Sequence, residues 1–274
     1  ENVRDQDVLR FNHQRHMAGN DMPPTKSGAK LDCNYCHQAE ANGRYMRPIN
    51  FEAHCQECHS LQFDVRNPDL QLPHGDAQLV RTFLRTLPAQ YGEFGRRKRG
   101  LTSESRINEF AAQQVRQLLT QFPNAEDLER TVFFTGDPYK ASQQLDPGSR
   151  AKYTGCAFCH EVKQATAASY PTAEITPPVM IERWLPHAQF SHATHESVSS
   201  CRDCHVAASS SRLTADVLVP TKESCVRCHK PTGLAQKASE CMTCHMYHSP
   251  EQPVLAAANV SLKEMLLETD ARGN

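Results

Sequence analysis

A five-residue pattern, Cys-x-x-Cys-His, occurs six times in this chain and uses all 12 of its cysteines. The copies begin at Cys33, Cys55, Cys156, Cys201, Cys225 and Cys241. In this pattern the two cysteines attach a c-type haem by thioether bonds, and the histidine that follows binds the iron from one side. Because every cysteine is used in this way, no thiol is left over for a disulfide or a nucleophile. The pattern therefore predicts six haem c groups.

The pattern also assigns residues to roles. We expect thioether bonds at Cys33, Cys36, Cys55, Cys58, Cys156, Cys159, Cys201, Cys204, Cys225, Cys228, Cys241 and Cys244. We expect the proximal iron ligands to be His37, His59, His160, His205, His229 and His245. Cys-x-x-Cys is also a zinc-ligand spacing, but zinc does not require a histidine directly after every pair. A structural zinc-ribbon protein, which would be colourless, is the alternative.

Eight histidines lie outside the motifs, whereas six irons need only six distal ligands. Histidine on both sides of every iron is therefore the simplest prediction. The candidate distal ligands are His13, His16, His54, His74, His192, His195 and His248, and His187 is the least favoured of the eight. Methionine is the competing ligand, and it would raise the reduction potential of its haem. Met17, Met22, Met46 and Met246 lie near motifs.

Two similar segments precede attachment motifs. Phe11-x-His13-x-x-His16 comes before Cys33, and Phe190-x-His192-x-x-His195 comes before Cys201. With the motifs, these segments resemble the multihaem c-type cytochromes, in particular the cytochrome c3 type (class III). The resemblance implies that His13 binds the haem at Cys33 and Cys36, and that His192 binds the haem at Cys201 and Cys204. It also implies that His16 and His195 bind irons attached elsewhere.

Composition bears on the fold. Hydrophobic residues make up 39% of the chain and aromatic residues only 7%, which is a low apolar content for building the core of a chain of this length. Six apolar macrocycles would supply surfaces for the polypeptide to pack against. We therefore expect a mostly irregular fold with short α-helices, wrapped on a haem stack, with little or no β-sheet.

The motifs divide the chain into four parts. We predict an N-terminal dihaem segment over 1–78, a haem-free helical insertion over 79–150, a tetrahaem segment over 151–248 and a tail over 249–274. Apolar spacing predicts helices over about 77–87, ended by Pro88, and from Ser103 or Ser105 to 122, stopped by Pro123. A further amphipathic helix is predicted over 254–267. The basic run 96–99 is expected to be a solvated loop, with docking of an acidic partner as the alternative.

The net charge and the hydropathy of the chain limit the classes of binding partner and the cellular compartment that we expect. The net charge of −1 implies no attraction to nucleic acid, and no stretch reaches the roughly 20 apolar residues that span a bilayer. The chain starts without a signal peptide, so we expect an exported, mature form in the periplasm or outside the cell. Redox partner proteins are expected, and copies of the chain itself are a further option.

An iron with two protein ligands has no open site for a substrate, so it can only change its oxidation state. The sequence therefore predicts electron transfer rather than catalysis. Two forms stay open: a discrete carrier, and a subunit of an extracellular cytochrome filament that exchanges histidines of its N-terminal arm with the next subunit. The enzyme alternative is a multihaem oxidoreductase with one five-coordinate haem.

Overall fold

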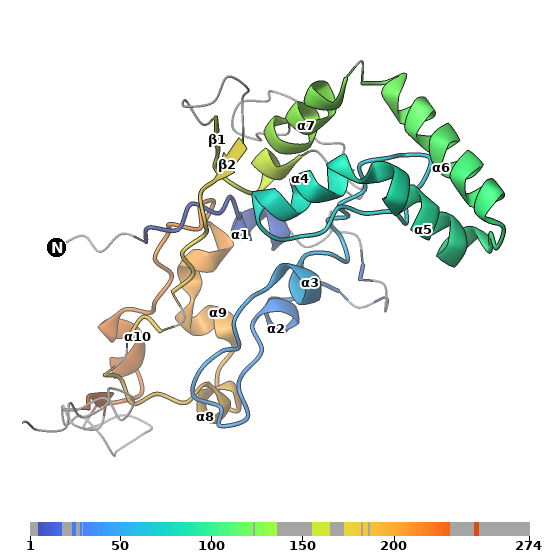
Figure 1. The fold of residues 1–274 in the computed structure, drawn as a ribbon. Coiled ribbons are helices and arrows are strands. Elements are labelled where there is room, and N and C mark those ends of the chain that lie inside the picture. Colours follow the sequence, from blue (N-terminus) through green and yellow to red (C-terminus); the bar gives the residue numbers. More distant parts are fainter. Residues whose placement is uncertain are drawn as a thin grey trace, which may run out of the picture.

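The computed structural model describes residues 5–17, 24–25, 28, 30–122, 124–135, 155–164, 173–181, 183–185, 187–230 and 244–246. These residues form short helices, irregular segments and one small sheet (Figure 1). The sheet has two antiparallel strands, β1 (Val162–Gln164) and β2 (Ala173–Ile175), with Val162 opposite Ile175. The predicted fold class, with little sheet, is confirmed. The predicted helix over 254–267 lies outside the described residues.

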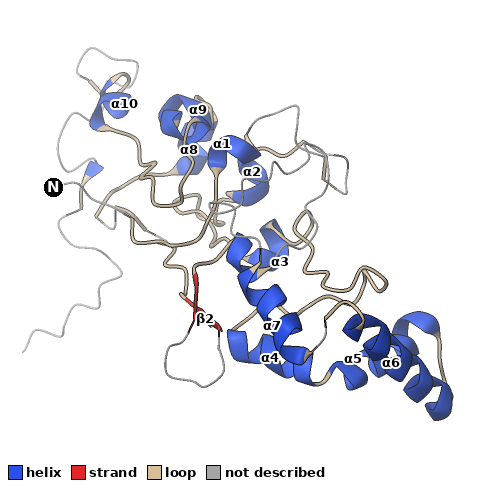
Figure 2. Ribbon diagram, turned by 90° about the horizontal axis from the view of Figure 1, so that it is seen from above, coloured by secondary structure: helices blue, strands red, loops and turns tan. Residues whose placement is uncertain are grey.

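Four longer helices form a block at one side of the molecule (Figures 1 and 2). They are α4 (Ala77–Arg85), α5 (Leu87–Arg99), α6 (Glu104–Leu119) and α7 (Ala125–Phe134). The Asp76 side chain begins α4 by accepting the backbone N–H of Leu79, and Gly100 ends α5 in the left-handed conformation, with a φ of 65°. None of the helices over the described residues combines the length and apolar character that crossing a bilayer requires.

Two of these helices correct the sequence-based predictions. Pro88 was predicted to end a helix, but it lies in the first turn of α5, where its missing N–H costs nothing. The basic run 96–99 is therefore the last turn of α5, where positive charge suits the helix dipole, and not a loop. The helix α7 was not predicted. Its N-cap is Asn124, whose side chain accepts the N–H of Asp127.

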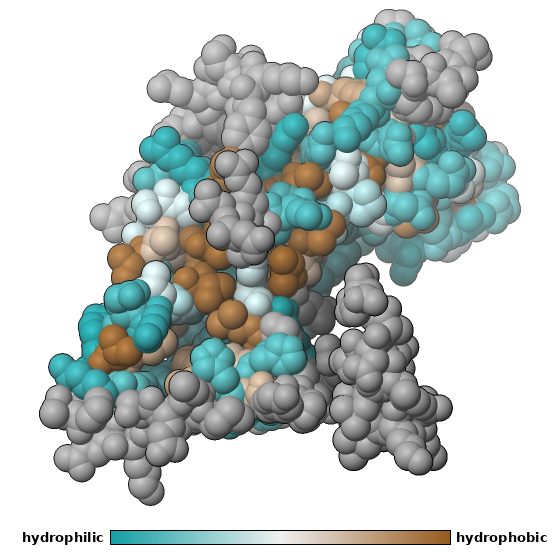
Figure 3. Space-filling view, turned by 90° about the vertical axis from the view of Figure 1, so that its left-hand side faces the viewer, coloured by the Kyte–Doolittle hydropathy of each residue, from teal (hydrophilic) through white to brown (hydrophobic). Residues whose placement is uncertain are grey.

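Most of the described attachment motifs, and the histidine-bearing segments that accompany them, lie outside this block on helices of about one turn. These are α1 (His13–His16), α2 (Cys33–Cys36), α3 (Phe51–His54), η1 (Cys156–Phe158), α8 (His192–Glu196), α9 (Cys201–Cys204), η2 (Val206–Ser209) and α10 (Lys222–Val226). Large apolar side chains stay exposed here, including Leu185, Val198 and Val206 at 58%, 81% and 66%. Figure 3 shows apolar side chains in a band across the left-hand face of the molecule. This side of the chain does not bury its apolar residues against itself.

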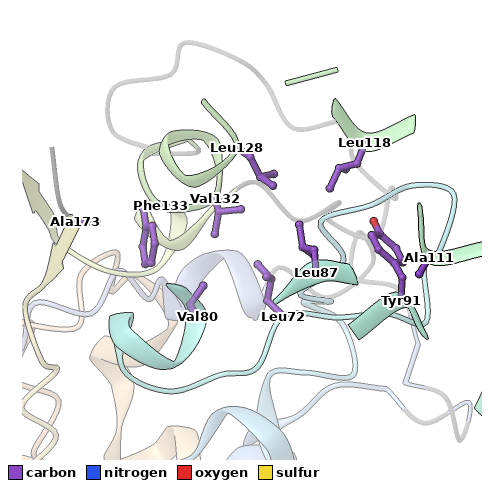
Figure 4. Close-up of a cluster of buried hydrophobic side chains, with 10 residues drawn as sticks. All are labelled: Leu72, Val80, Leu87, Tyr91, Ala111, Leu118, Leu128, Val132, Phe133 and Ala173. Atoms are coloured by element: carbon purple, nitrogen blue, oxygen red, sulfur yellow. The ribbon is translucent and has the colours of Figure 1, made fainter. Parts of the chain in front are cut away.

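The buried core lies instead within and beside the helical block (Figure 4). Its members are Leu72, Val80, Leu87, Tyr91, Ala111, Leu118, Leu128, Val132, Phe133 and Ala173. Polar groups inside it are paired: the Tyr91 hydroxyl donates to Asp64 at 2.8 Å, and Arg81 donates to Glu129 at 2.9 Å. The block therefore has the packing of an ordinary globular unit, in contrast to the motif-bearing side.

Candidate haem-binding sites

The two Phe-x-His-x-x-His segments fold in the same way. In α1 the Asn12 side chain accepts the N–H of Arg15, and in α8 the Ser191 side chain accepts that of Thr194. These caps begin one turn of helix, so the second histidine of each segment comes to lie over the capping residue. Nδ1 of His16 lies 2.8 Å from the carbonyl oxygen of Asn12, and Nδ1 of His195 lies 2.8 Å from that of Ser191. Nε2 is then the nitrogen available to a metal.

The phenylalanine of each segment holds both of its histidines. The Phe11 ring stacks on His16, with centroids 4.4 Å apart, and Phe190 stacks on His195 at 4.4 Å. Each phenylalanine also meets the first histidine edge-on at 4.8 Å. Because the two geometries agree so closely, the segments are structural repeats as well as sequence repeats.

Four proximal histidines each face a histidine from outside the motifs. The ring centroids are 6.3 Å apart for His13 and His37, 6.1 Å for His16 and His59, 6.1 Å for His74 and His160, and 6.0 Å for His195 and His229. Two imidazoles on opposite sides of one metal ion, with metal–nitrogen distances of about 2 Å, have centroids about 6 Å apart. The spacing of all four pairs therefore fits two axial ligands of one iron.

The pairs can be compared with the ligand roles that the resemblance implied. His13 faces the histidine of the motif that follows it, and His16 and His195 face histidines of more distant motifs. His74 is positioned by Phe51, which stacks on its ring at 4.2 Å. Iron binding by these residues stays a prediction, but the folded chain brings the proposed ligands together.

Other candidate ligands have no facing histidine ring within the part of the chain that the structure describes. These are His54, His187 and His192, together with the proximal histidines His205 and His245. His54 nevertheless takes the same pose as His16, with Nδ1 3.0 Å from the carbonyl oxygen of Asn50. Nδ1 of His192 lies 3.0 Å from the carbonyl oxygen of Arg44. Cys241 and His248 lie outside the described residues.

Burial favours the neutral form of several histidines in the facing pairs. Burial, followed by the nearby His37 and His16, lowers the pKa of His13 to about 4. Burial also lowers the pKa of His16, His37, His59 and His160. Neutral imidazole is the form that binds a metal. The buried Nδ1 atoms of His13, His160 and His229 find no hydrogen-bond partner among the described residues.

Three of the motif cysteines are held as neutral thiols, and the described residues show no cluster of zinc ligands. Burial raises the pKa of Cys36, Cys55 and Cys159 to about 11, which disfavours the thiolate that binds zinc. Among the described residues, no group of three or more His, Cys, Asp or Glu side chains is placed to hold a metal ion. A structural zinc site takes four such ligands, whereas a haem iron takes only two from the protein.

Comparison with known proteins agrees with this geometry. Residues 188–246 match the family model described as cytochrome c7 and related cytochrome c. This part of the chain is similar to the cytochromes c7. No curated protein and no solved structure matches the chain. The matched segment holds the motifs at Cys201, Cys225 and Cys241, and it supports a multihaem cytochrome that carries haem c and transfers electrons.

Proposed function

We propose that this protein is an electron carrier that holds six haem c groups, most of them with histidine on both sides of the iron. The observation that carries the proposal is the set of four histidine pairs at 6.0–6.3 Å, each joining an attachment motif to a histidine elsewhere in the chain. When bound, each haem supplies an iron that gains and loses one electron. The expected location is the periplasm or the outside of the cell.

The chain's own residues would set how easily each iron is reduced. Backbone carbonyls at Asn12 and Ser191 fix the orientation of His16 and His195, so each ring can present Nε2 without rearrangement. Two histidine ligands at an iron leave no position for a substrate. This supports transfer of electrons to and from redox partner proteins, rather than catalysis at the iron.

A discrete carrier is favoured over a filament by the N-terminal arm. His13 and His16 face His37 and His59 of the same chain, so these two histidines are already used within one subunit. Exchange of this arm between subunits would have to break both pairs. We therefore propose a carrier that supplies its own ligands at these sites and docks transiently with its partners.

Purified protein tests the proposal. We expect a Soret band, a mass equal to the polypeptide plus six haems, and a low-spin ferric electron paramagnetic resonance spectrum. Protein without a Soret band would contradict haem binding altogether. A high-spin ferric signal in the unmodified protein would favour the enzyme with a five-coordinate haem, and filaments in negative-stain micrographs would contradict the discrete carrier.

A further inference from the structure

Neighbouring attachment motifs touch through the residues between their cysteines. Tyr35 of the first motif donates its hydroxyl hydrogen to Glu57 of the second at 2.7 Å. Arg227 of the fifth motif donates to the carbonyl oxygen of Asp203 in the fourth at 2.7 Å. Two pairs of motifs that follow each other in the sequence are therefore also adjacent in space.

The third motif lies beside the second, although the helical block separates them in the sequence. The Phe158 ring lies 6.2 Å from that of His59, and His160 faces His74, which precedes the block. The N-terminal arm holds the same motif, because the N–H of Arg10 donates to the carbonyl oxygen of Cys159 at 2.7 Å. The third motif thus belongs with the first two.

The fourth motif meets the first. Cys33 and Cys201 line one small cavity together with Met17, Arg202 and His205. Arg202 Nη2 lies 3.9 Å from the sulfur of Met17, which is the residue directly after α1. Just beyond this cavity, the N–H of Gln14 donates to the carbonyl oxygen of Ser211 at 2.8 Å, and Arg212 donates to the Gln14 side chain at 2.8 Å.

The sixth motif is held beside the segment that serves the fifth. The N–H of Gln189 donates to the carbonyl oxygen of Cys244 at 2.8 Å, and Ala188 pairs with His245 in an isolated bridge. Phe190, which follows Gln189, stacks on His195, and His195 faces His229 of the fifth motif.

We infer that the haem-attachment sites stand in one file whose order differs from that of the sequence, running through the sites at Cys156, Cys55, Cys33, Cys201 and Cys225 and, through Cys244, the sixth motif. The chain then consists of two trihaem halves that meet through their first motifs, and the helical block is inserted between the second and third motifs of the first half. The family match, which starts at residue 188, covers only the second half.

This inference rests on the proposed function, since the file carries electrons only if haems fill it. An electron that enters one half would reach the other through the contact between the sites at Cys33 and Cys201. With haem bound, the two sites would hold irons of which one gives up the electron that its neighbour takes up. A division into dihaem and tetrahaem parts would instead place the third motif with the last three.

Photo-cross-linking of the haem-loaded protein tests the order. The substitution Met17→p-benzoylphenylalanine places a photoreactive ring at the Cys33–Cys201 cavity. After irradiation and proteolysis, we expect mass spectrometry to find cross-links to residues 201–209. The reciprocal substitution Ser209→p-benzoylphenylalanine should link to residues 14–37, because Ser209 lines the same cavity. A matched control, Val226→p-benzoylphenylalanine on the fifth motif, should give no link to residues 33–37.

The outcomes separate the two proposals. Mass and the Soret band, recorded before irradiation, report haem loading independently of the cross-links. Protein that carries six haems but links position 17 to the third or fifth motif, or gives no link to residues 201–209, would overturn the order while leaving the electron-carrier proposal intact. Protein without haem would overturn the electron-carrier proposal itself.

Discussion

Single imidazoles show how a short sequence pattern prepares a metal ligand. His16, His54 and His195 each follow a helix-capping residue by four positions, and each places Nδ1 2.8–3.0 Å from the carbonyl oxygen of that residue. A backbone contact of this kind fixes the ring before any metal arrives. His54 shares this arrangement, so it keeps its place among the candidate distal ligands.

Replacement of His74 should open one haem. The variant His74→Ala removes the ring that faces His160 at 6.1 Å, so the iron at Cys156 and Cys159 would lose one axial ligand. We expect a new high-spin ferric signal from about one haem in six, seen by electron paramagnetic resonance. The matched variant His187→Ala should leave the spectrum low-spin, since His187 faces no proximal histidine in the described part of the chain. An unchanged spectrum for His74→Ala would contradict the pairing.

At the scale of elements, Arg81 joins two helices of the block to each other and to the small sheet. Arg81 of α4 donates to Glu129 of α7 and also to the carbonyl oxygen of Ala173 in β2. Both charged side chains are nearly buried, at 12% and 11% exposure. Loss of one partner leaves the other charge buried without compensation, which costs far more than loss of both.

The variant Arg81→Met should therefore lower the free energy of unfolding by about 3 kcal/mol. The double variant Arg81→Met with Glu129→Leu should recover much of this loss, because no charge is then left unpaired. Chemical denaturation followed by far-ultraviolet circular dichroism measures both. Equal losses in the single and double variants would contradict the assigned role of the pair.

A close backbone contact joins α7 to the third motif. Gly155 has a φ of 107°, and a Cβ placed there would overlap with the carbonyl oxygen of Thr135 at the end of α7. The substitution Gly155→Ala should therefore lower stability and reduce haem attachment at Cys156. Gly100 also has a positive φ but has open space around it, so Gly100→Ala should cost only about 1 kcal/mol. Thermal unfolding and the haem-to-protein ratio distinguish the two variants.

The helices also show which parts of the fold could be predicted from the sequence. Apolar periodicity located α4 and α6, because these helices bury one face against the core. It missed α5, because Pro88 was interpreted as the end of a helix although it stands in the first turn of one, and it missed α7, which begins after Asn124. For the sites, the motifs and the Phe-x-His-x-x-His segments were evident from residue types alone. The pairing of His74 with His160 was not, since it depends on how the helical block folds.

The molecule as a whole combines two regions that are stabilised differently. The helical block has a buried core of its own, whereas the one-turn α-helices of the motif-bearing side contain no buried residue. Apolar surface that is not buried by protein requires another partner, and porphyrin rings would provide one. The fold of this side should therefore depend on its cofactors.

Hydrogen exchange on protein expressed without haem attachment measures this dependence. We expect amides of residues 77–119 to stay protected, while amides of residues 187–230 exchange at least 100-fold faster than in the haem-loaded protein, which corresponds to about 3 kcal/mol of opening free energy. Haem-loaded protein is the control. Comparable protection of residues 187–230 in both forms would contradict a cofactor-dependent fold.

The position of the helical block has a consequence for assembly. His74 lies just before α4, and η1, which leads to His160, is packed against α7, so the helices separate these two facing histidines along the chain. Closing a flexible loop of this length carries an entropic penalty of several kcal/mol, which folding of the four helices would remove. The histidine pair at Cys156 should then be the last to form, because it depends on folding of a segment that holds no cofactor. The pairs that include His13 and His16 do not depend on that segment.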